Sequence, residues 1–390
     1  MDLSLLRSLF PYSVWDCWWL APVALLLDLR LGDPALPWPH PVCFAGRLLG
    51  RLEGPARRWM QRGGAAGEKR RGRLAGLVCL FLLTGVSGLA VWLLISLPLL
   101  GVLPAVYLAW AGLAMGSLLD TGREVLRRVE TYPEPEAREA LSRLVSRDTG
   151  RMDRPLMRKT LADTLSENFT DALRAPFFWL LLAGPVGLWM YKAVSTTDSM
   201  WGYLTERWRW LGWAGARADD CLAFIPARLS VGALRLTDVL LRCLRPAARI
   251  WDGSWPGFRV VARQAAGMPS PNSGWSMAAC AWLCRARMAG PSVYFGALVD
   301  KPWLGPPRES AAPWDRARLL ALCALMRYSA LYGGLSLWLA CLLLRFFFAR
   351  RMLHVAGRIV CLLSGCGLSD RGHRRGRRAG AARPGAVERA

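Results

Sequence analysis

Residues 74–119 read LAGLVCLFLLTGVSGLAVWLLISLPLLGVLPAVYLAWAGLAMGSLL, and residues 75–119 contain no charged side chain. A membrane-spanning helix needs about 20 consecutive apolar residues, so the stretch has room for two such helices. Pro98, Gly101 and Pro104 lie near its middle and favour a turn there. The stretch therefore predicts two spans, at about 74–97 and 102–119, in an all-α polytopic integral membrane protein.

The composition of the whole chain agrees with a membrane protein. Hydrophobic residues make up 53% of the 390 residues, which leaves too few polar side chains to coat several soluble domains. The formal net charge is +23, yet no zinc-finger, RNA-recognition or helix-turn-helix pattern is visible, so we expect no nucleic-acid partner. Basic cytoplasmic loops that face anionic membrane lipid explain this charge better.

Further apolar and basic segments flank the uncharged stretch. Residues 15–31 form a first apolar segment and residues 331–348 form a last one. Residues 47–73 are strongly basic and are therefore expected on the cytoplasmic side. We expect one integral membrane domain over residues 1–365 and a basic, disordered tail over residues 366–390.

The apolar residues 175–194 contain Gly184 and Pro185 at their centre. A simple span there would place the Arg-rich residues 195–330 outside the cell, against the positive-inside rule. Either the segment is a broken or re-entrant hairpin, or a second crossing returns within residues 222–244. The second crossing would carry charged side chains into lipid, which is costly. We therefore favour the hairpin, which keeps the helical loops at the cytoplasmic face.

Residues 159–173 have two opposed stripes. Apolar side chains recur every fourth residue and form one face of a helix. Lys159, Asp163, Glu167 and Asp171 recur at the same spacing on the opposite face. An ordinary amphipathic helix with a solvated acidic face is the interpretation that the pattern alone favours. The alternative is an acidic row that faces a bound magnesium ion or an amine.

Residues 191–230 place many charged side chains among aromatic rings, directly after the apolar segment. Charged side chains so close to a segment that is apolar enough to span a membrane are costly unless they are paired or bind a charged ligand. Residues 267–281 read GMPSPNSGWSMAACA, a turn that leads into a helix with Ser270 or Asn272 as its cap. Such a helix start suits phosphate, and a plain capped turn is an equally good interpretation.

Several of these segments, taken in order, resemble the adenosylcobinamide-phosphate synthase family of cobalamin biosynthesis (CbiB/CobD). The resemblance covers about residues 22–300, and the ordered set of motifs is specific although each motif alone is weak. The motifs are LLLDLRLGDP (25–34), PHPV (39–42), RDT (147–149), SEN (166–168), DALRAP (171–176), YKAV (191–194), TDSMWGY (197–203), ARADD (216–220), IPARLS (225–230) and SPNSGW (270–275).

The resemblance implies a multi-pass enzyme of the bacterial cytoplasmic (inner) membrane. It would join aminopropanol phosphate, or ethanolamine phosphate, to a propionate carboxyl of adenosylcobyric acid through an amide bond, giving adenosylcobinamide phosphate. The resemblance also implies ATP and magnesium as cofactors, a corrinoid as substrate, and other cobalamin-assembly enzymes as partners. No GxxxxGK[ST] loop is present, so the expectation of ATP depends on the resemblance alone.

The residue chemistry is compatible with such a ligase. An amide can form from a carboxylate once the acyl group is activated, and phosphates need basic clamps and magnesium. Aromatic residues within 201–213 are expected to hold the flat face of the corrin ring. The expected catalytic residues are Glu167, Asp198, Asp219 and Asp220, with Asp198 and Asp220 also as magnesium ligands. The expected substrate-binding residues are Arg147, Asp148, Asn168, Lys192, Arg217, Arg228, Ser270 and Asn272.

The chain differs from the family pattern at four motif positions. Ser195 and Ala223 stand where the family usually has asparagine, and Asp163 and Met277 stand where it usually has glutamate. These differences imply either an altered substrate choice or a divergent paralogue. The alternative function is therefore a non-catalytic membrane sensor or regulatory paralogue on the same fold. A transporter is a third hypothesis, although the charges cluster in loops and no paired inverted segments are visible.

Overall fold

The computed structural model describes residues 8–34, 37–62, 64, 67–98, 100–294 and 296–363, with side chains up to residue 347. The chain divides into two compact units, Met1–Leu342 and Leu343–Ala390. The tail expected over residues 366–390 lies outside the described residues.

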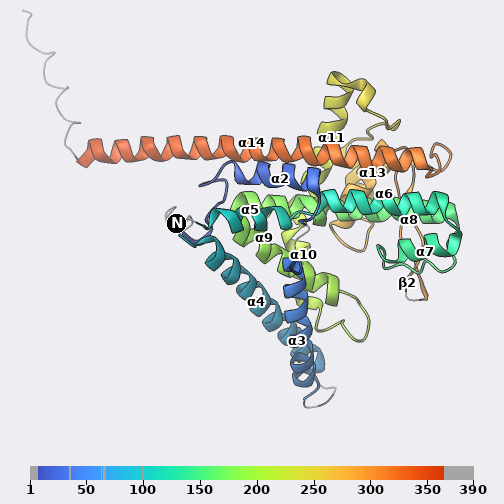
Figure 1. Ribbon diagram of the computed structural model, residues 1–390, viewed down its shortest axis with the longest axis horizontal. Helices are drawn as coiled ribbons and strands as arrows, with labels where there is room; N and C mark the ends of the chain where they lie inside the picture. Colours follow the sequence, from blue (N-terminus) through green and yellow to red (C-terminus); the bar gives the residue numbers. More distant parts are fainter. Residues whose placement is uncertain are drawn as a thin grey trace, which may run out of the picture. The chain divides into compact units, whose positions relative to one another are not determined.

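The described secondary structure is almost entirely helical, which confirms the all-α prediction (Figure 1). Two short antiparallel pairs, β1 (Met288–Ala289) with β4 (Trp303–Leu304) and β2 (Ser292–Tyr294) with β3 (Ala297–Val299), are its extended parts. A π-helix, η1 (Thr170–Arg174), joins α8 to α9, and a 3-10 helix, η2 (Pro246–Ala248), follows α11. The α-helices are α2 (Leu20–Leu31), α3 (Pro41–Gln61), α4 (Glu68–Ile95), α5 (Val102–Ala111), α6 (Met115–Thr131), α7 (Glu134–Ser142), α8 (Arg154–Phe169), α9 (Ala175–Trp201), α10 (Trp213–Leu222), α11 (Phe224–Leu244), α12 (Phe258–Ala265), α13 (Ser273–Leu283) and α14 (Arg316–Leu363).

Within the described part of the chain, four helical segments are long and apolar enough to cross a membrane: Glu68–Ile95, Val102–Thr131, Arg154–Trp201 and Arg316–Phe347. The first contains most of the span predicted at 74–97, the second contains the span predicted at 102–119, and the last contains most of the predicted apolar segment 331–348. Large apolar side chains on α4 are exposed, which suits contact with lipid tails. The helices therefore agree with the predicted polytopic membrane fold.

The segment Arg154–Trp201 folds back on itself at Gly184. Ala183 and Gly184 have non-helical dihedral angles, and φ of Gly184 is +59°, where an added side chain would also meet the backbone near Pro11. The Tyr191 hydroxyl donates to Oδ1 of Asp171 at 3.4 Å. In a continuous helix these residues would stand about 30 Å apart, so the chain must reverse between them. The predicted broken hairpin is thus confirmed.

The charged side of α8 is not solvated. Asp163 is fully buried, and its carboxylate accepts from Nη1 of Arg147 (2.6 Å), Nζ of Lys159 (2.9 Å) and the backbone N–H of Ala289 (2.9 Å). Lys159 is buried as well. The favoured interpretation of a solvated acidic face is therefore wrong for this part of the row. The physical reason is that α13 and β1 pack against α8 and cover that side.

A second buried carboxylate anchors α11. Asp238 is fully buried and accepts from Nη1 of Arg235 (3.0 Å), Nε of Arg249 (2.8 Å) and Nε1 of Trp251 (2.9 Å). These bonds tie the connector after α11 to the helix. They also pair Arg235 and Asp238, two charged residues of the segment 222–244, with each other.

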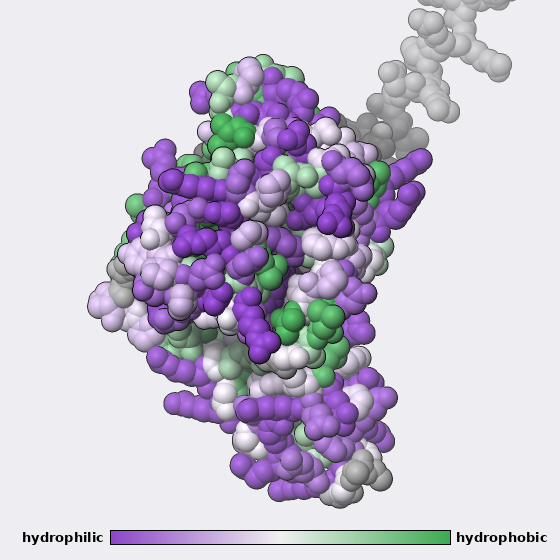
Figure 2. Space-filling view, turned by 90° about the vertical axis from the view of Figure 1, so that its right-hand side faces the viewer, coloured by the Kyte–Doolittle hydropathy of each residue, from purple (hydrophilic) through white to green (hydrophobic). Residues whose placement is uncertain are grey.

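The end of the first unit that contains α7 and β2 is polar. Figure 2 faces this end and shows hydrophilic side chains over most of it. Ion pairs such as Arg127–Glu124 and Arg143–Glu139 lie on this surface. Polar residues therefore gather away from the exposed apolar side of α4.

Candidate functional site

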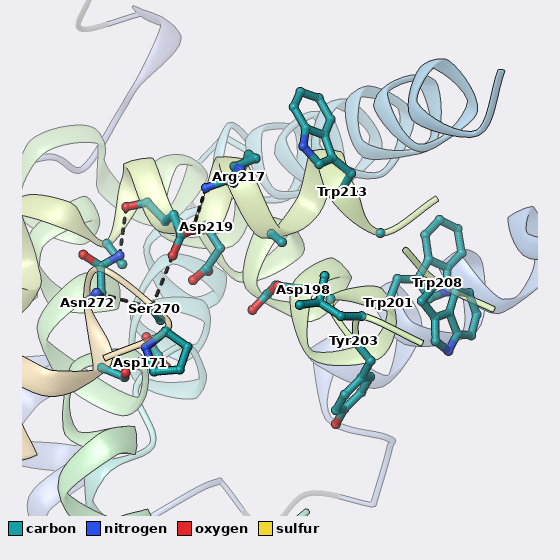
Figure 3. A pocket seen from close by; sticks show the side chains of 18 of the residues that line it. Asp171, Asp198, Trp201, Tyr203, Trp208, Trp213, Arg217, Asp219, Ser270 and Asn272 are labelled. Carbon is teal, nitrogen blue, oxygen red and sulfur yellow. Dashed lines mark hydrogen bonds and ion pairs between the residues drawn. The ribbon is translucent and has the colours of Figure 1, made fainter. Parts of the chain in front are cut away.

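A cavity of about 410 Å³ lies where η1, α9, α10 and the turn before α13 meet (Figure 3). Figure 3 shows its acidic residues around one space, with the aromatic residues on one side and Ser270 and Asn272 on the other. Five carboxylates line it: Glu167, Asp171, Asp198, Asp219 and Asp220. The α9 hairpin explains this grouping, because Asp171 and Asp198 stand at similar distances along the chain on either side of Gly184.

Most of the predicted site residues line this cavity. They are Glu167, Asp198, Arg217, Asp219, Asp220, Ser270 and Asn272. Four separate motifs, at 166–168, 197–203, 216–220 and 270–275, therefore converge in space. The catalytic and binding roles of the individual residues stay predictions.

Five of the predicted binding residues lie outside the cavity lining, and three of them are held by the surrounding fold. Arg147 is buried, and its guanidinium donates to Asp163 (2.6 Å) and to the Tyr294 hydroxyl (3.0 Å), so it belongs to the buried ion cluster. Asp148 accepts from the backbone N–H of Gly150 (3.0 Å) and closes a local turn. Asn168 is half-buried on α8.

Lys192 and Arg228 lie close to the cavity without lining it. Lys192, on α9, is within electrostatic range of Asp171 and Asp219. Arg228 donates to Oδ1 of Asn272 (3.3 Å) and stacks on Trp275, with its guanidinium carbon 4.6 Å from the ring centroid. Both can therefore influence the charge or position of residues that line the cavity.

Asn272 supports the cavity instead of capping its own helix. It precedes α13 but makes no side-chain capping bond there. Its Nδ2 donates to the backbone carbonyl of Asp220 (2.8 Å), and Ser270 Oγ donates to Asp220 Oδ1 (3.3 Å). The prediction of Asn272 as a cap is wrong, because its amide bridges α10 and Arg228 of α11. The turn before α13 thereby positions the Asp220 carboxylate.

The carboxylates on α10 have perturbed acidities. Burial, followed by the negative charges of Asp171, Asp198 and Asp220, raises the pKa of Asp219 well above the ordinary aspartate value. One of its carboxylate oxygens, Oδ1, is buried without a hydrogen-bond partner among the described residues. Burial also raises the pKa of Asp220, against the opposing effects of Ser270 and Arg217. Such a cluster favours a bound proton, an ammonium group or a metal cation.

One wall of the cavity is aromatic, formed by Trp201, Tyr203, Trp208 and Trp213. Trp201 and Trp208 are stacked, with ring centroids 5.5 Å apart and planes 17° apart. Arg57 of α3 lies over Trp208, with its guanidinium carbon 4.6 Å from the ring centroid. The loop after α9 is thus held against α3, and the predicted aromatic surface lies at the cavity.

The oxygen ligands of the cavity suit a magnesium ion that binds together with a substrate phosphate. They do not form a complete metal site by themselves. No group of three or more His, Cys, Asp or Glu side chains is arranged for a metal ion in the described part of the chain. Magnesium prefers oxygen ligands and commonly takes one or two carboxylates together with substrate phosphates. Asp198 and Asp220 could supply such carboxylates to an ion that arrives with a phosphate.

Some lining residues were not among the predicted site residues. Asp171 and Arg209 line the cavity, and so does Ala223. Asp171 carried a signal, since it belongs both to the acidic row and to the motif at 171–176. Ala223 is one of the four family differences, and the other three lie outside the lining: Asp163 and Met277 are buried and Ser195 is half-buried.

Comparisons with known proteins match most of the chain. The family model for CobD/Cbib protein matches residues 21–323. The cobalamin biosynthesis protein CobD of Klebsiella pneumoniae is 35% identical over 324 residues, 81% of this chain and 97% of that protein. CobD of Rhodobacter capsulatus is 36% identical over 307 residues (77% and 90%), and the cobalamin biosynthesis protein CbiB of Salmonella typhi is 33% identical over 305 residues (77% and 91%). No solved structure matches the chain.

Proposed function

The chain belongs to the CobD/CbiB family of cobalamin biosynthesis proteins, and we propose that it forms an amide between a corrinoid carboxyl and an amino alcohol phosphate. Its family and its membrane-compatible helices make it a membrane protein and a cobalamin biosynthesis enzyme. The proposed substrates are adenosylcobyric acid and aminopropanol phosphate or ethanolamine phosphate. The proposed product is adenosylcobinamide phosphate.

The observation that carries this proposal is the cavity that combines five carboxylates, two arginines and an aromatic wall. An amino alcohol phosphate has an ammonium group for the carboxylates and a phosphate for Arg209 and Arg217. A volume of about 410 Å³ accommodates this small substrate and the end of a propionate arm. The much larger corrin ring would rest on the aromatic rim.

Asp219 is the proposed proton acceptor. The amine nitrogen attacks only after its ammonium form has lost a proton, and a carboxylate with a raised pKa is a stronger base than an ordinary one. The unpartnered Oδ1 of Asp219 would take that proton. The new carbon–nitrogen bond then replaces the bond from the acyl carbon to its leaving group.

Carboxyl activation is the step for which ATP and magnesium are proposed. Phosphoryl transfer to the propionate would make an acyl phosphate, and inorganic phosphate would leave as the amide forms. Magnesium would neutralise phosphate charge when bound, with Asp198 and Asp220 as its ligands. Arg217 would contact phosphate oxygens, and Ser270 and Asn272 would keep Asp220 in place.

The proposed location is the bacterial inner membrane, with a multi-pass topology and the cavity at the cytoplasmic side. Arg57 and Arg73, from the basic segment 47–73, stack on Trp208 and Trp213 of the cavity wall. The cavity therefore lies at the basic end of α4, which the positive-inside rule places in the cytoplasm.

Complementation tests the proposed reaction. In a strain that lacks this step, the wild-type chain should restore cobalamin-dependent growth on cobyric acid. Cobinamide should support growth of the same strain even when the chain is absent. Asp198→Ala or Asp220→Ala should abolish growth on cobyric acid, whereas Asp120→Asn, on the exposed surface of α6, should not. A wild-type chain that accumulates in the membrane but fails to restore growth on cobyric acid would reject the proposal.

A further inference from the structure

A groove of about 640 Å³ lies between α4, the α9 hairpin and α10. On α10, Asp219 lines the carboxylate cavity, whereas Ala214 and Ala218 line this groove. Trp213 and Arg217 line both. In Figure 3, Trp213 extends from α10 away from Asp198. The helix α10 therefore separates two spaces of opposite chemistry, one acidic and one apolar.

Along α4, the groove and Arg73 together extend over about the thickness of one membrane leaflet. Leu77, Phe81 and Thr84 of α4 line it, and Arg73 stands one turn before Leu77. Between Arg73 and Thr84 the helix rises about 16 Å, which is close to half of the roughly 30 Å hydrocarbon core of a bilayer. Among the described residues that line the groove, Arg217 is the one with a charged side chain. The length and the apolar walls match a lipid acyl chain.

Two guanidinium groups with unused hydrogen-bonding capacity lie at the basic end of the groove. Arg73 stacks on Trp213, with its guanidinium carbon 4.6 Å from the ring centroid. Its Nε is buried without a hydrogen-bond partner among the described residues. The Arg217 side chain is 68% exposed and lies 3.8 Å from Asp220, beyond hydrogen-bond distance. Two such donors beside an interfacial tryptophan suit a phosphodiester.

We infer that this groove binds an anionic glycerophospholipid, with one acyl chain between α4 and α9, the phosphodiester at Arg73, and the positive charge of Arg217 beside the headgroup. A zwitterionic lipid has the same chain but brings a cationic headgroup towards two arginines. Each basic residue at a membrane surface favours an anionic lipid by a factor of roughly five, which corresponds to about 1 kcal/mol. The groove should therefore select lipids by charge as well as by chain.

Native mass spectrometry of the full chain in mild detergent tests this inference. With phosphatidylglycerol and phosphatidylcholine of identical acyl chains at equal concentrations, the wild-type protein should retain at least tenfold more phosphatidylglycerol. Arg73→Gln should lower phosphatidylglycerol retention about fivefold and phosphatidylcholine retention less, because phosphatidylcholine carries the same phosphodiester together with a cationic headgroup. Leu77→Trp, which fills the groove from α4, should lower retention of both lipids.

Arg70→Gln is the matched control, because Arg70 is an exposed cation on the same helix. It should leave lipid retention unchanged, and Arg73→Lys should keep the preference if Arg73→Gln proves unstable. Equal retention of the two lipids, or equal losses in Arg73→Gln and Arg70→Gln, would overturn the inference in favour of non-specific lipid contact. Competition by millimolar glycerol 3-phosphate would also overturn it, since the acyl chain would then contribute nothing.

Discussion

Asp219 is the residue on which the proposed proton transfer depends, and its environment makes a pH prediction. Its carboxyl must be ionised to accept a proton, and burial together with neighbouring aspartates raises its pKa. Activity should therefore fall as the pH drops through that raised value, at a higher pH than an ordinary aspartate would require. Asp171→Asn removes one neighbouring negative charge, so it should shift this acidic limb to lower pH.

The measurement is the pH dependence of kcat/KM for the amino alcohol phosphate. Asp120→Asn, which removes an exposed carboxylate on α6, serves as the control and should leave the limb in place. An acidic limb that is identical in the wild type and Asp171→Asn would argue against Asp219 as the titrating base.

The small side chain of Ala223 should affect which amino alcohol phosphate the cavity prefers. The side chain lines the cavity at a position where the family usually has asparagine. Aminopropanol phosphate carries one methyl group more than ethanolamine phosphate, and a methyl group in a tight pocket changes selectivity by roughly tenfold or more. Ala223→Asn should therefore lower kcat/KM for aminopropanol phosphate relative to ethanolamine phosphate. An unchanged ratio in a direct competition assay would show that Ala223 does not contact the differing methyl group.

At the scale of elements, the link between α11 and its following connector depends on Asp238. Burial alone would raise the pKa of Asp238, but bonds from Trp251 and Arg249 and the nearby arginine charges outweigh it and lower the pKa. The stabilisation is therefore present above the ordinary aspartate pKa and is lost as the pH falls through the lowered value. Asp238→Asn should reduce the free energy of unfolding by about 3 kcal/mol at pH 7.

Thermal unfolding in detergent at several pH values checks this prediction. The difference between Asp238→Asn and the wild type should shrink as the medium becomes acidic. Asp315→Asn offers a comparison, because Asp315 is an exposed helix-start residue that accepts from the N–H of Arg318. A constant difference at every pH would mean that the charge of Asp238 does not stabilise α11.

The helices and their breaks were predictable from the sequence where they depend on the hydropathy or backbone preference of neighbouring residues. The uncharged residues 74–119 and the Gly184–Pro185 break depend on hydropathy and backbone preference, which neighbouring residues determine. The charged row of α8 was not predictable in the same way. Burial of Asp163 depends on Arg147 and Ala289, which are far away in the sequence, so its periodicity matched a solvated face equally well.

The candidate site shows the same division. Motif order brought together the segments that contain Glu167, Asp198, Asp219 and Asn272, and the cavity joins them. Side-chain type alone could not separate a ligand clamp from a structural ion pair. Arg147, predicted as a phosphate or carboxylate contact, donates to Asp163 in the fold, and this partner could not be identified from the sequence.

At the scale of the whole molecule, the α9 hairpin and the basic end of α4 predict that the cavity and the loop between α3 and α4 both face the cytoplasm. In a cysteine-free background, Arg62→Cys and Glu206→Cys should both react with a membrane-permeant maleimide and resist an impermeant one in intact cells. Leu100→Cys, at the other end of α4, should react with the impermeant reagent. All three positions are exposed, so access depends on the side of the membrane. Labelling of Glu206→Cys by the impermeant reagent would place the cavity on the wrong side.

The most direct test of the central claim is amide formation by the purified protein in liposomes, with adenosylcobyric acid, aminopropanol phosphate, ATP and magnesium supplied and the product identified by mass spectrometry. The wild type should produce adenosylcobinamide phosphate, and Asp219→Asn should produce it at a rate at least about 100-fold lower, the loss typical of a missing general base. Wild-type rates from Asp219→Asn, or no amide product from the wild-type protein, would contradict the central claim.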